Sequence, residues 1–242
     1  MVHTLPDYTS KWKTKTISAI ADNAELAVRL GSIDTFDRRG NVVWMDDFEG
    51  IGQKWRYSYS FAVGTTTLSA TRCYRGSTSM KQVTNTNIDD YAEIWKILPN
   101  PSNSSLGIEA TLYQDDSSGY YVMYLLGYTG TTYYSAAVKW DWATHNVYYQ
   151  DDTPGWVLLD SVPFKNWVDE YWLPIKIVLD WSTFRYKRII VGENEYDMSA
   201  FDLYHAASVQ RASIQIRIGQ HTAAAAAKTG YVDNVILTQN EV

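Results

Sequence analysis

Side chains alternate with a period of two through most of the chain after residue 40. In the segment WRYSYSFAV, residues 55–63, aromatic side chains alternate with arginine and serine. Successive side chains of a β-strand point to opposite faces of a sheet, so this pattern predicts a strand with one buried face. Similar segments, separated by turns rich in Gly, Asn, Asp or Pro, follow one another to residue 240.

No helical segment separates these predicted strands, which excludes a βαβ fold because parallel strands need crossover connections. Short strands at near-regular spacing indicate an antiparallel sandwich or barrel. We therefore predict an all-β, two-sheet antiparallel β-sandwich domain over residues 42–242. The alanine-rich segment TAAAAAK, residues 222–228, is too short for a stable helix and is expected to form a loop or turn.

The first 41 residues follow a different pattern and are predicted to form an N-terminal arm. Within it, TISAIADNAELAVRLGS has apolar residues at helical spacing and a glycine, Gly31, where a helix would end. This arm is therefore expected to hold one helix. Because arms that leave a β-sandwich often clasp a neighbouring subunit, we expect self-association through it.

Charge and cysteine content exclude several classes of protein. The formal net charge is −6, which argues against a nucleic-acid partner, since such partners select basic surfaces. The single cysteine, Cys73, excludes an intrachain disulfide and is expected to be a small buried apolar residue. No apolar run is long enough to cross a membrane. The start of the sequence shows no signal-peptide pattern. We nevertheless expect an extracellular or virion-surface location rather than the cytoplasm.

Three segments resemble the concanavalin-like and jelly-roll sugar-binding modules. DDFEGIGQKW, near the start of the β-rich region, is similar to their first turn, and GYVDNVILT is similar to their last strand. CYRGSTSMKQVT resembles the element that follows the first turn. The resemblance implies a jelly-roll or concanavalin-like sandwich whose first and last strands are neighbours.

The same resemblance implies a structural calcium ion shared by the two ends of the domain. Glu49 and Asp233 match the two acidic positions, and Asp47 is a nearby candidate. Calcium takes six to eight oxygen ligands, so backbone carbonyls would have to complete the set. The alternative is that Asp46 and Asp47 are solvated turn residues and that Asp233 forms hydrogen bonds to a loop.

Aromatic side chains on consecutive predicted strands suggest a sugar-binding platform. Sugar rings pack on aromatic faces while polar side chains bind the hydroxyl groups. The candidates are Trp140, Trp142, Tyr148, Asp141 and Tyr133. Trp140 and Trp142 are two residues apart and must share one face of a strand. The alternative is that this face is the core of the sandwich, since aromatic residues favour strands in any case.

No catalytic constellation is evident. Glycosidases need two carboxyl groups at a set separation, and the acid pairs that we find fall at turns or on opposite faces of a strand. The leading hypothesis is thus a non-catalytic glycan-binding or structural surface module. A virion decoration or other self-assembling protein is the first alternative. A glycoside hydrolase or polysaccharide lyase is the second, supported by fold analogy alone.

Overall fold

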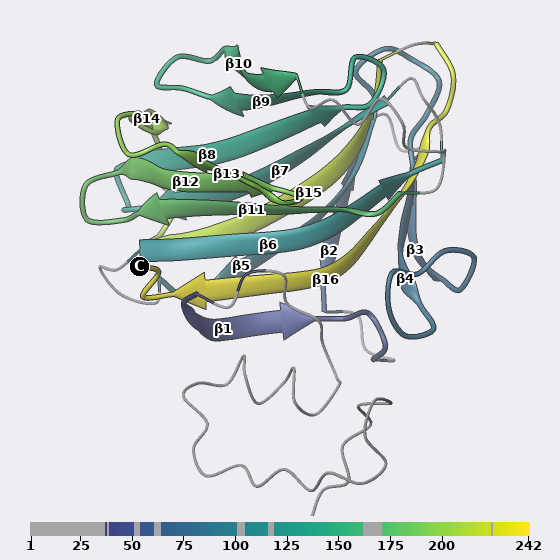
Figure 1. Cartoon of the computed structure of the whole chain (residues 1–242), viewed down its shortest axis with the longest axis horizontal. Helices are drawn as coiled ribbons and strands as arrows, with labels where there is room; N and C mark the ends of the chain where they lie inside the picture. Colours follow the sequence, from purple (N-terminus) through teal and green to yellow (C-terminus); the bar gives the residue numbers. More distant parts are fainter. Residues whose placement is uncertain are drawn as a thin grey trace, which may run out of the picture.

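The computed structural model describes residues 37, 39–50, 54–60, 64–100, 105–115, 119–161, 171–223 and 225–242. Within these ranges the chain forms two antiparallel sheets of eight strands each, packed face to face as a sandwich (Figure 1). The predicted two-sheet β-sandwich is therefore confirmed. No helix in the described ranges has the length and apolar character that crossing a membrane requires.

The first sheet has the strand order β13-β12-β11-β6-β16-β4-β3, with β1 paired to β16 beside β4. Its strands are β1 (Asn41–Asp46), β3 (Thr65–Ser69), β4 (Ser79–Val83), β6 (Ser105–Gln114), β11 (Leu173–Asp180), β12 (Arg185–Val191), β13 (Asn194–Asp197) and β16 (Thr229–Gln239).

The second sheet has the order β10-β9-β8-β7-β15-β5-β2, with β14 paired to β8. Its strands are β2 (Arg56–Tyr59), β5 (Tyr91–Leu98), β7 (Gly119–Tyr128), β8 (Thr132–Asp141), β9 (Asn146–Gln150), β10 (Trp156–Ser161), β14 (Tyr204–Ala207) and β15 (Ser213–Thr222). Strand β14, in the short sequence YHAA, was not predicted because four residues give too little alternation to detect.

Alternation along the strands fills the space between the sheets with apolar side chains. On β6 the residues Leu106, Ile108 and Ala110 point inward, and none exposes any side-chain surface. On β7 the corresponding inward residues are Tyr121 and Met123. Each sheet thus has one face in the core, as the sequence pattern predicts.

The first and last strands are neighbours, as the resemblance implied. Asp46 at the end of β1 lies opposite Val235 on β16. The register of β16 against β6 shifts between Asp233 and Ile236, and Asn234 there has a φ of 49°. This irregularity is a β-bulge, and bulges turn a side chain away from its normal direction.

Two contacts fix the sheets against each other. The Tyr186 hydroxyl on β12 accepts a hydrogen bond from the backbone N–H of Ala137 at 2.9 Å and donates to the carbonyl oxygen of Gln150 at 2.7 Å, both in the second sheet. The Trp181 ring, which follows β11, covers Gly127 on β7 so closely that a Cβ atom there would overlap the ring. Glycine at 127 is therefore required by packing.

Ion pairs join the two ends of the chain on the outer side of the first sheet. The ammonium of Lys176 is fully buried and lies 2.9 Å from Asp37 and 2.7 Å from Glu241. Arg188 forms a further ion pair with Glu241. Burial of this lysine is tolerated because two carboxylates compensate its charge.

Three expectations about the N-terminal region stay predictions, and the one about Cys73 is corrected. The helical arm lies outside the described residues apart from its last few positions, so the arm, the domain boundary at residue 41 and self-association stay predictions. Cys73 was expected to be a small buried residue, but it is half-buried and lies in the loop between β3 and β4. The segment after Ser69 turns away from the sheet because the carboxylates described below hold it as a loop.

Candidate functional site

The outer face of the second sheet, which we call the cleft face, carries a row of large polar side chains. Residues directly opposite each other in neighbouring strands share a face. Tyr124 on β7 lies opposite Arg217 on β15, and Arg217 lies opposite Trp95 on β5. Glu93 is two residues from Trp95 and so points to the same side.

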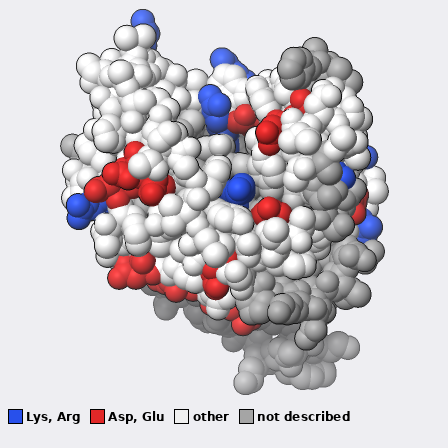
Figure 2. All heavy atoms as spheres, turned by 90° about the horizontal axis from the view of Figure 1, so that it is seen from above, with Lys and Arg blue, Asp and Glu red and all other residues white. Residues whose placement is uncertain are grey.

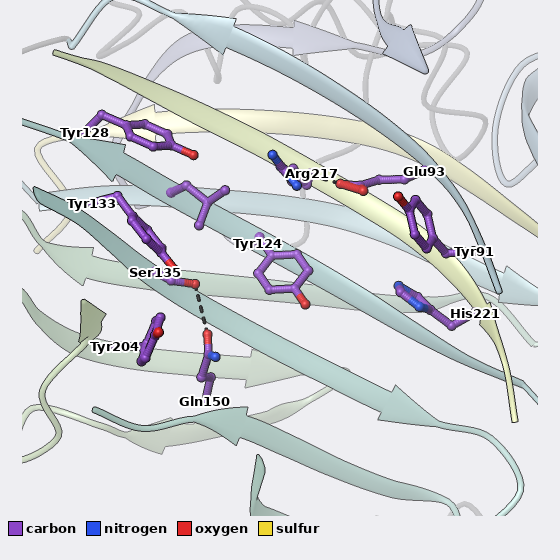
Figure 3. A pocket seen from close by; sticks show the side chains of 11 residues that line it. Tyr91, Glu93, Tyr124, Tyr128, Tyr133, Ser135, Gln150, Tyr204, Arg217 and His221 are labelled. Atoms are coloured by element: carbon purple, nitrogen blue, oxygen red, sulfur yellow. Dashed lines mark hydrogen bonds and ion pairs between the residues drawn. The ribbon is translucent and has the colours of Figure 1, made fainter. Parts of the chain in front are cut away.

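A pocket of about 440 Å³ opens on the cleft face. Its lining comes from β5, β7, β8, β9, β14 and β15, so six strands of one sheet contribute. Figure 3 shows the side chains of Tyr124, Arg217 and Glu93 directed into the same space. The lining residues are Tyr91, Glu93, Tyr124, Leu126, Tyr128, Tyr133, Ser135, Gln150, Tyr204, Arg217 and His221.

Glu93 and Arg217 form a loose ion pair at one wall of the pocket. The guanidinium Nε of Arg217 lies 3.7 Å from Oε1 of Glu93, and neither atom has a hydrogen-bond partner among the described residues. Burial raises the pKa of Glu93 to about 7, and the charge of Arg217 offsets this only in part. Both groups therefore retain hydrogen-bonding capacity that a bound molecule could use.

Neutral polar groups surround this pair. Burial lowers the pKa of His221 to about 4, so its imidazole is uncharged at pH 7. Burial, reinforced by the nearby charge of Glu93, raises the pKa of Tyr124 to about 12, so its hydroxyl keeps its proton. His221 also stacks on Tyr120, with ring centroids 4.8 Å apart. The pocket thus combines aromatic faces with hydroxyl, imidazole and guanidinium groups.

The side chains of Gln150 and Ser135 bound the pocket on the β8–β9 side. The Ser135 hydroxyl donates a hydrogen bond of 3.0 Å to Oε1 of Gln150. This bond, drawn as a dashed line in Figure 3, fixes the amide so that its NH₂ group stays available as a donor. The amide and the Tyr204 ring close that side.

The structure separates the predicted ligand residues into two groups. Tyr133 lines the pocket, and Tyr148 and Asp141 lie on the same face, because each is opposite a cleft-face residue in the strand register. Trp140 and Trp142 point into the core, with exposed fractions of 1% and 7%. The prediction that these two tryptophans form an exposed platform is therefore wrong, because β8 turns its even-numbered residues inward.

Glu93, Arg217, Tyr204 and His221 were not among the predicted site residues. A signal for two of them exists in the sequence. Glu93 in YAEIWKIL and Arg217 in SIQIRIGQ are charged residues that alternate with apolar ones inside strands. Charged side chains are rarely buried unless they are paired or functional, so such positions identify candidate site residues.

The acids of the first turn bind the loop between β3 and β4. Glu49 accepts hydrogen bonds from the backbone N–H of Ser77 at 2.7 Å and of Thr78 at 2.8 Å. Asp233, turned by the bulge in β16, accepts from the N–H of Tyr74 at 2.8 Å. Asp47 accepts a bond from the N–H of Glu49 within its own turn.

Asp46 has a separate, structural role. Its carboxylate accepts a hydrogen bond of 2.9 Å from the indole N–H of Trp55 and lies 2.6 Å from the ammonium of Lys54. Trp55 packs in the core against Trp44 and Phe48. Of the acids in the first turn, Asp46 thus anchors the turn to the core.

Glu49 and Asp233 converge on one loop, which bears on the expected calcium ion. Burial raises the pKa of Asp233 to about 6, and the negative charge of Glu49 adds to the effect. The two carboxylates accept backbone N–H groups of this loop, and they supply oxygen atoms of the type that calcium takes. The described part of the chain contains no group of three or more His, Cys, Asp or Glu side chains arranged for a metal ion. Carbonyl oxygens would therefore have to supply most ligands.

Charges are interspersed on the surface view of Figure 2. Red acidic patches and separate blue basic groups both occur on this face, and its described residues form no broad basic stripe. This distribution matches the net charge of −6.

Comparison with known proteins identifies the fold. The sequence matches no protein-family model and no curated protein. A solved structure of an endo-β-1,4-glucuronan lyase from the fungus Trichoderma reesei matches with a TM-score of 0.56 and 12% identity, over 82% of this chain and 95% of that one. An alginate lyase from a Chlorella virus has a TM-score of 0.54 and 13% identity, over 82% of this chain and 100% of that one.

A protein of unknown function with a galectin-like fold, from Bacillus subtilis, is similar at a TM-score of 0.51. It is 10% identical, over 84% of this chain and 97% of that one. At these identities the similarity concerns the fold and not the activity. The chain has the concanavalin-like jelly-roll β-sandwich fold.

Proposed function

We propose that the cleft face binds a polysaccharide chain. The observation that carries this proposal is the pocket itself, in which tyrosine rings surround the Glu93–Arg217 pair and the Gln150 amide. Aromatic faces pack against the CH groups of sugar rings, and charged and amide side chains bind hydroxyl or carboxylate groups. Because the pocket is open and six strands contribute to it, it suits a chain that continues beyond one sugar.

Binding of soluble polysaccharides tests this proposal. Wild-type protein is titrated calorimetrically with neutral and acidic polysaccharides, and the Tyr124→Ala variant is compared with it. Loss of the central ring should weaken binding at least about tenfold, or about 1.4 kcal/mol. Tyr74→Ala is the matched control, because Tyr74 is an exposed tyrosine in the loop between β3 and β4. Equal affinities of all three proteins would contradict the proposal.

A second candidate function is cleavage of an acidic polysaccharide by β-elimination. In this reaction a base removes the proton next to the uronate carboxylate, the bond to the neighbouring sugar breaks, a C=C double bond forms and the leaving oxygen takes a proton. Arg217 could neutralise the carboxylate, the neutral imidazole of His221 could accept a proton, and the protonated Tyr124 could donate one. Two solved structures of similar fold are polysaccharide lyases, which supports this candidate as an analogy.

Product analysis separates the two functions. Elimination produces an unsaturated sugar that absorbs ultraviolet light, whereas binding alone produces none. A steady rise in absorbance with polyuronates, abolished by His221→Ala and Tyr124→Phe, would establish the lyase. Binding without such a rise would leave the protein as a binding module.

A further inference from the structure

A lysine surrounded by aromatic rings lies on the cleft face beside the pocket, where Tyr120 of this cluster stacks on the pocket residue His221. The ammonium of Lys139 on β8 is 4.2 Å from the ring centroid of Tyr148, 5.4 Å from that of Trp156 and 5.6 Å from that of Tyr120. These rings come from β9, β10 and β7, so the ammonium is held between three strands. None of the four residues lines the pocket.

The positive charge of Lys139 is not neutralised by the described part of the chain. Cation–π contacts stabilise an ammonium without cancelling its charge. No carboxylate of the described residues lies within ion-pair distance of it. Asp141, the nearest acid along β8, accepts hydrogen bonds from the N–H groups of Ala143 and Thr144 in the following turn. Asp89 instead accepts a bond of 3.1 Å from the Tyr120 hydroxyl.

Lys139 and Arg217 are two cations on one face at a distance that the strand register defines. Lys139 lies opposite Val122, which lies opposite Gly219, two residues from Arg217. Two strand spacings across the sheet and two residues along it give roughly 12 Å between the Cα atoms of Lys139 and Arg217. An oligosaccharide that runs along the cleft face can contact both side chains through different sugar units.

We propose that Lys139, with Tyr148 and Trp156, forms a second subsite that binds an anionic substituent of an extended acidic polysaccharide whose chain also contacts Arg217. This inference rests on the proposed function and deepens it by naming the ligand class and a minimum length. The two rings give the sugar a surface to pack on, and the ammonium supplies a charge-assisted hydrogen bond to a carboxylate or sulfate. A neutral polysaccharide can pack on the two rings but has no anionic group that the ammonium could bind.

Oligosaccharides of defined length test the second subsite. Wild-type protein and the Lys139→Met variant are titrated with disaccharides and hexasaccharides of glucuronan, polymannuronate and polygalacturonate, and with cello-oligosaccharides of the same lengths. Methionine keeps an unbranched side chain of similar length but removes the charge. We expect Lys139→Met to weaken binding of an acidic hexasaccharide about tenfold, with little effect on the acidic disaccharide. The variant should also lose part of the salt dependence of binding.

Lys81→Met is the matched control, because Lys81 is a half-buried lysine on β4 of the other sheet and its loss changes the net charge equally. If both variants lose the same affinity, the effect is one of total charge and the second subsite is wrong. Unchanged binding by Lys139→Met, while Tyr124→Ala is impaired, overturns the subsite and leaves the proposed function standing. If wild-type protein binds no oligosaccharide at all, both proposals fail.

Discussion

Glu49 and Asp233 come from opposite ends of the chain and hold the same loop. Glu49 accepts hydrogen bonds from the N–H groups of Ser77 and Thr78. Asp233 accepts them from the N–H groups of Tyr74 and Arg75. Between these pairs lies Gly76, with a φ of 72°, where a side chain would collide with the carboxylate of Glu49. The loop therefore depends on residues that are far apart in the chain and adjacent only after folding.

We propose that calcium binds at this loop, and we predict that it raises the melting temperature. A ligand that binds only the folded chain at a hundredfold excess over its dissociation constant stabilises it by about 2.7 kcal/mol. For a domain of this size that corresponds to about 5–10 °C. Differential scanning calorimetry with calcium and with chelator measures the shift, and Glu49→Gln should abolish it. Asp152→Asn, at an exposed turn, should retain it. Identical curves for wild-type protein in both buffers would show that the loop binds no calcium.

Binding of acidic oligosaccharides should strengthen as pH falls from 8 to 6. With a pKa of about 7, Glu93 becomes neutral over this interval and no longer competes for the charge of Arg217. Calorimetric titration at several pH values measures the trend, which Glu93→Gln should flatten. Glu193→Gln, at the turn between β12 and β13, should leave the trend unchanged. A wild-type affinity that rises with pH would contradict this role of Glu93.

The same carboxyl group should affect stability. Its pKa in the folded chain lies above the ordinary value of 4.5, so folding favours the protonated form. The free energy of unfolding should therefore decline as pH rises from about 4.5 to about 7, and Glu93→Gln should remove that part of the decline. Denaturant unfolding at each pH measures the difference. A wild-type protein and variant with parallel pH profiles would show that Glu93 is not buried as described.

Gly127→Ala should destabilise the sandwich by about 3 kcal/mol. A methyl group at this position overlaps the Trp181 ring, which crosses from the other sheet, and overpacking of this kind shifts backbone or side chains. Urea denaturation measures the loss. Gly155→Ala is the control, because a Cβ there meets only the Thr153 hydroxyl at an ordinary distance of 3.5 Å. Equal stability of the two variants would mean that Trp181 does not cover β7.

Trp140→Ala and Trp156→Ala should have opposite consequences. Trp140 is buried, so its truncation leaves a cavity and costs about 3–5 kcal/mol of stability. Trp156 is half-buried on the cleft face, so its loss should cost little stability and weaken polysaccharide binding. Thermal unfolding and calorimetric titration of both variants provide the comparison. A stable Trp140→Ala variant with weakened binding would restore the original platform interpretation.

The fold was predictable because one physical rule, alternation with period two, repeats along the chain and tolerates local errors. The adjacency of the two ends was also predictable, from short motifs around Glu49 and Asp233. The buried face of β8 could not be predicted, because both faces of this strand carry aromatic residues. Tyr133 points outward and Trp140 points inward. Only the packing of the second sheet on the first decides between them.

The pocket was beyond sequence analysis for a related reason. Glu93 and Arg217 lie on strands that are distant in sequence, and their proximity depends on the pairing of β5 with β15. Pairing between such strands follows from the topology of the whole sheet and not from local pattern. Charged residues inside apolar strands could still have identified each of the two as unusual.

The counter-charges of Lys176 lie outside the first and last strands, so they bear on how much of the chain a stable sandwich needs. A version that starts at Asn41 would lack Asp37, and one that stops at Gln239 would lack Glu241. Either would leave a fully buried cation with one counter-charge fewer, which is costly because a buried charge needs compensation. We therefore expect the smallest stable version of the sandwich to extend from Asp37 to Glu241, past the ends of its outermost strands.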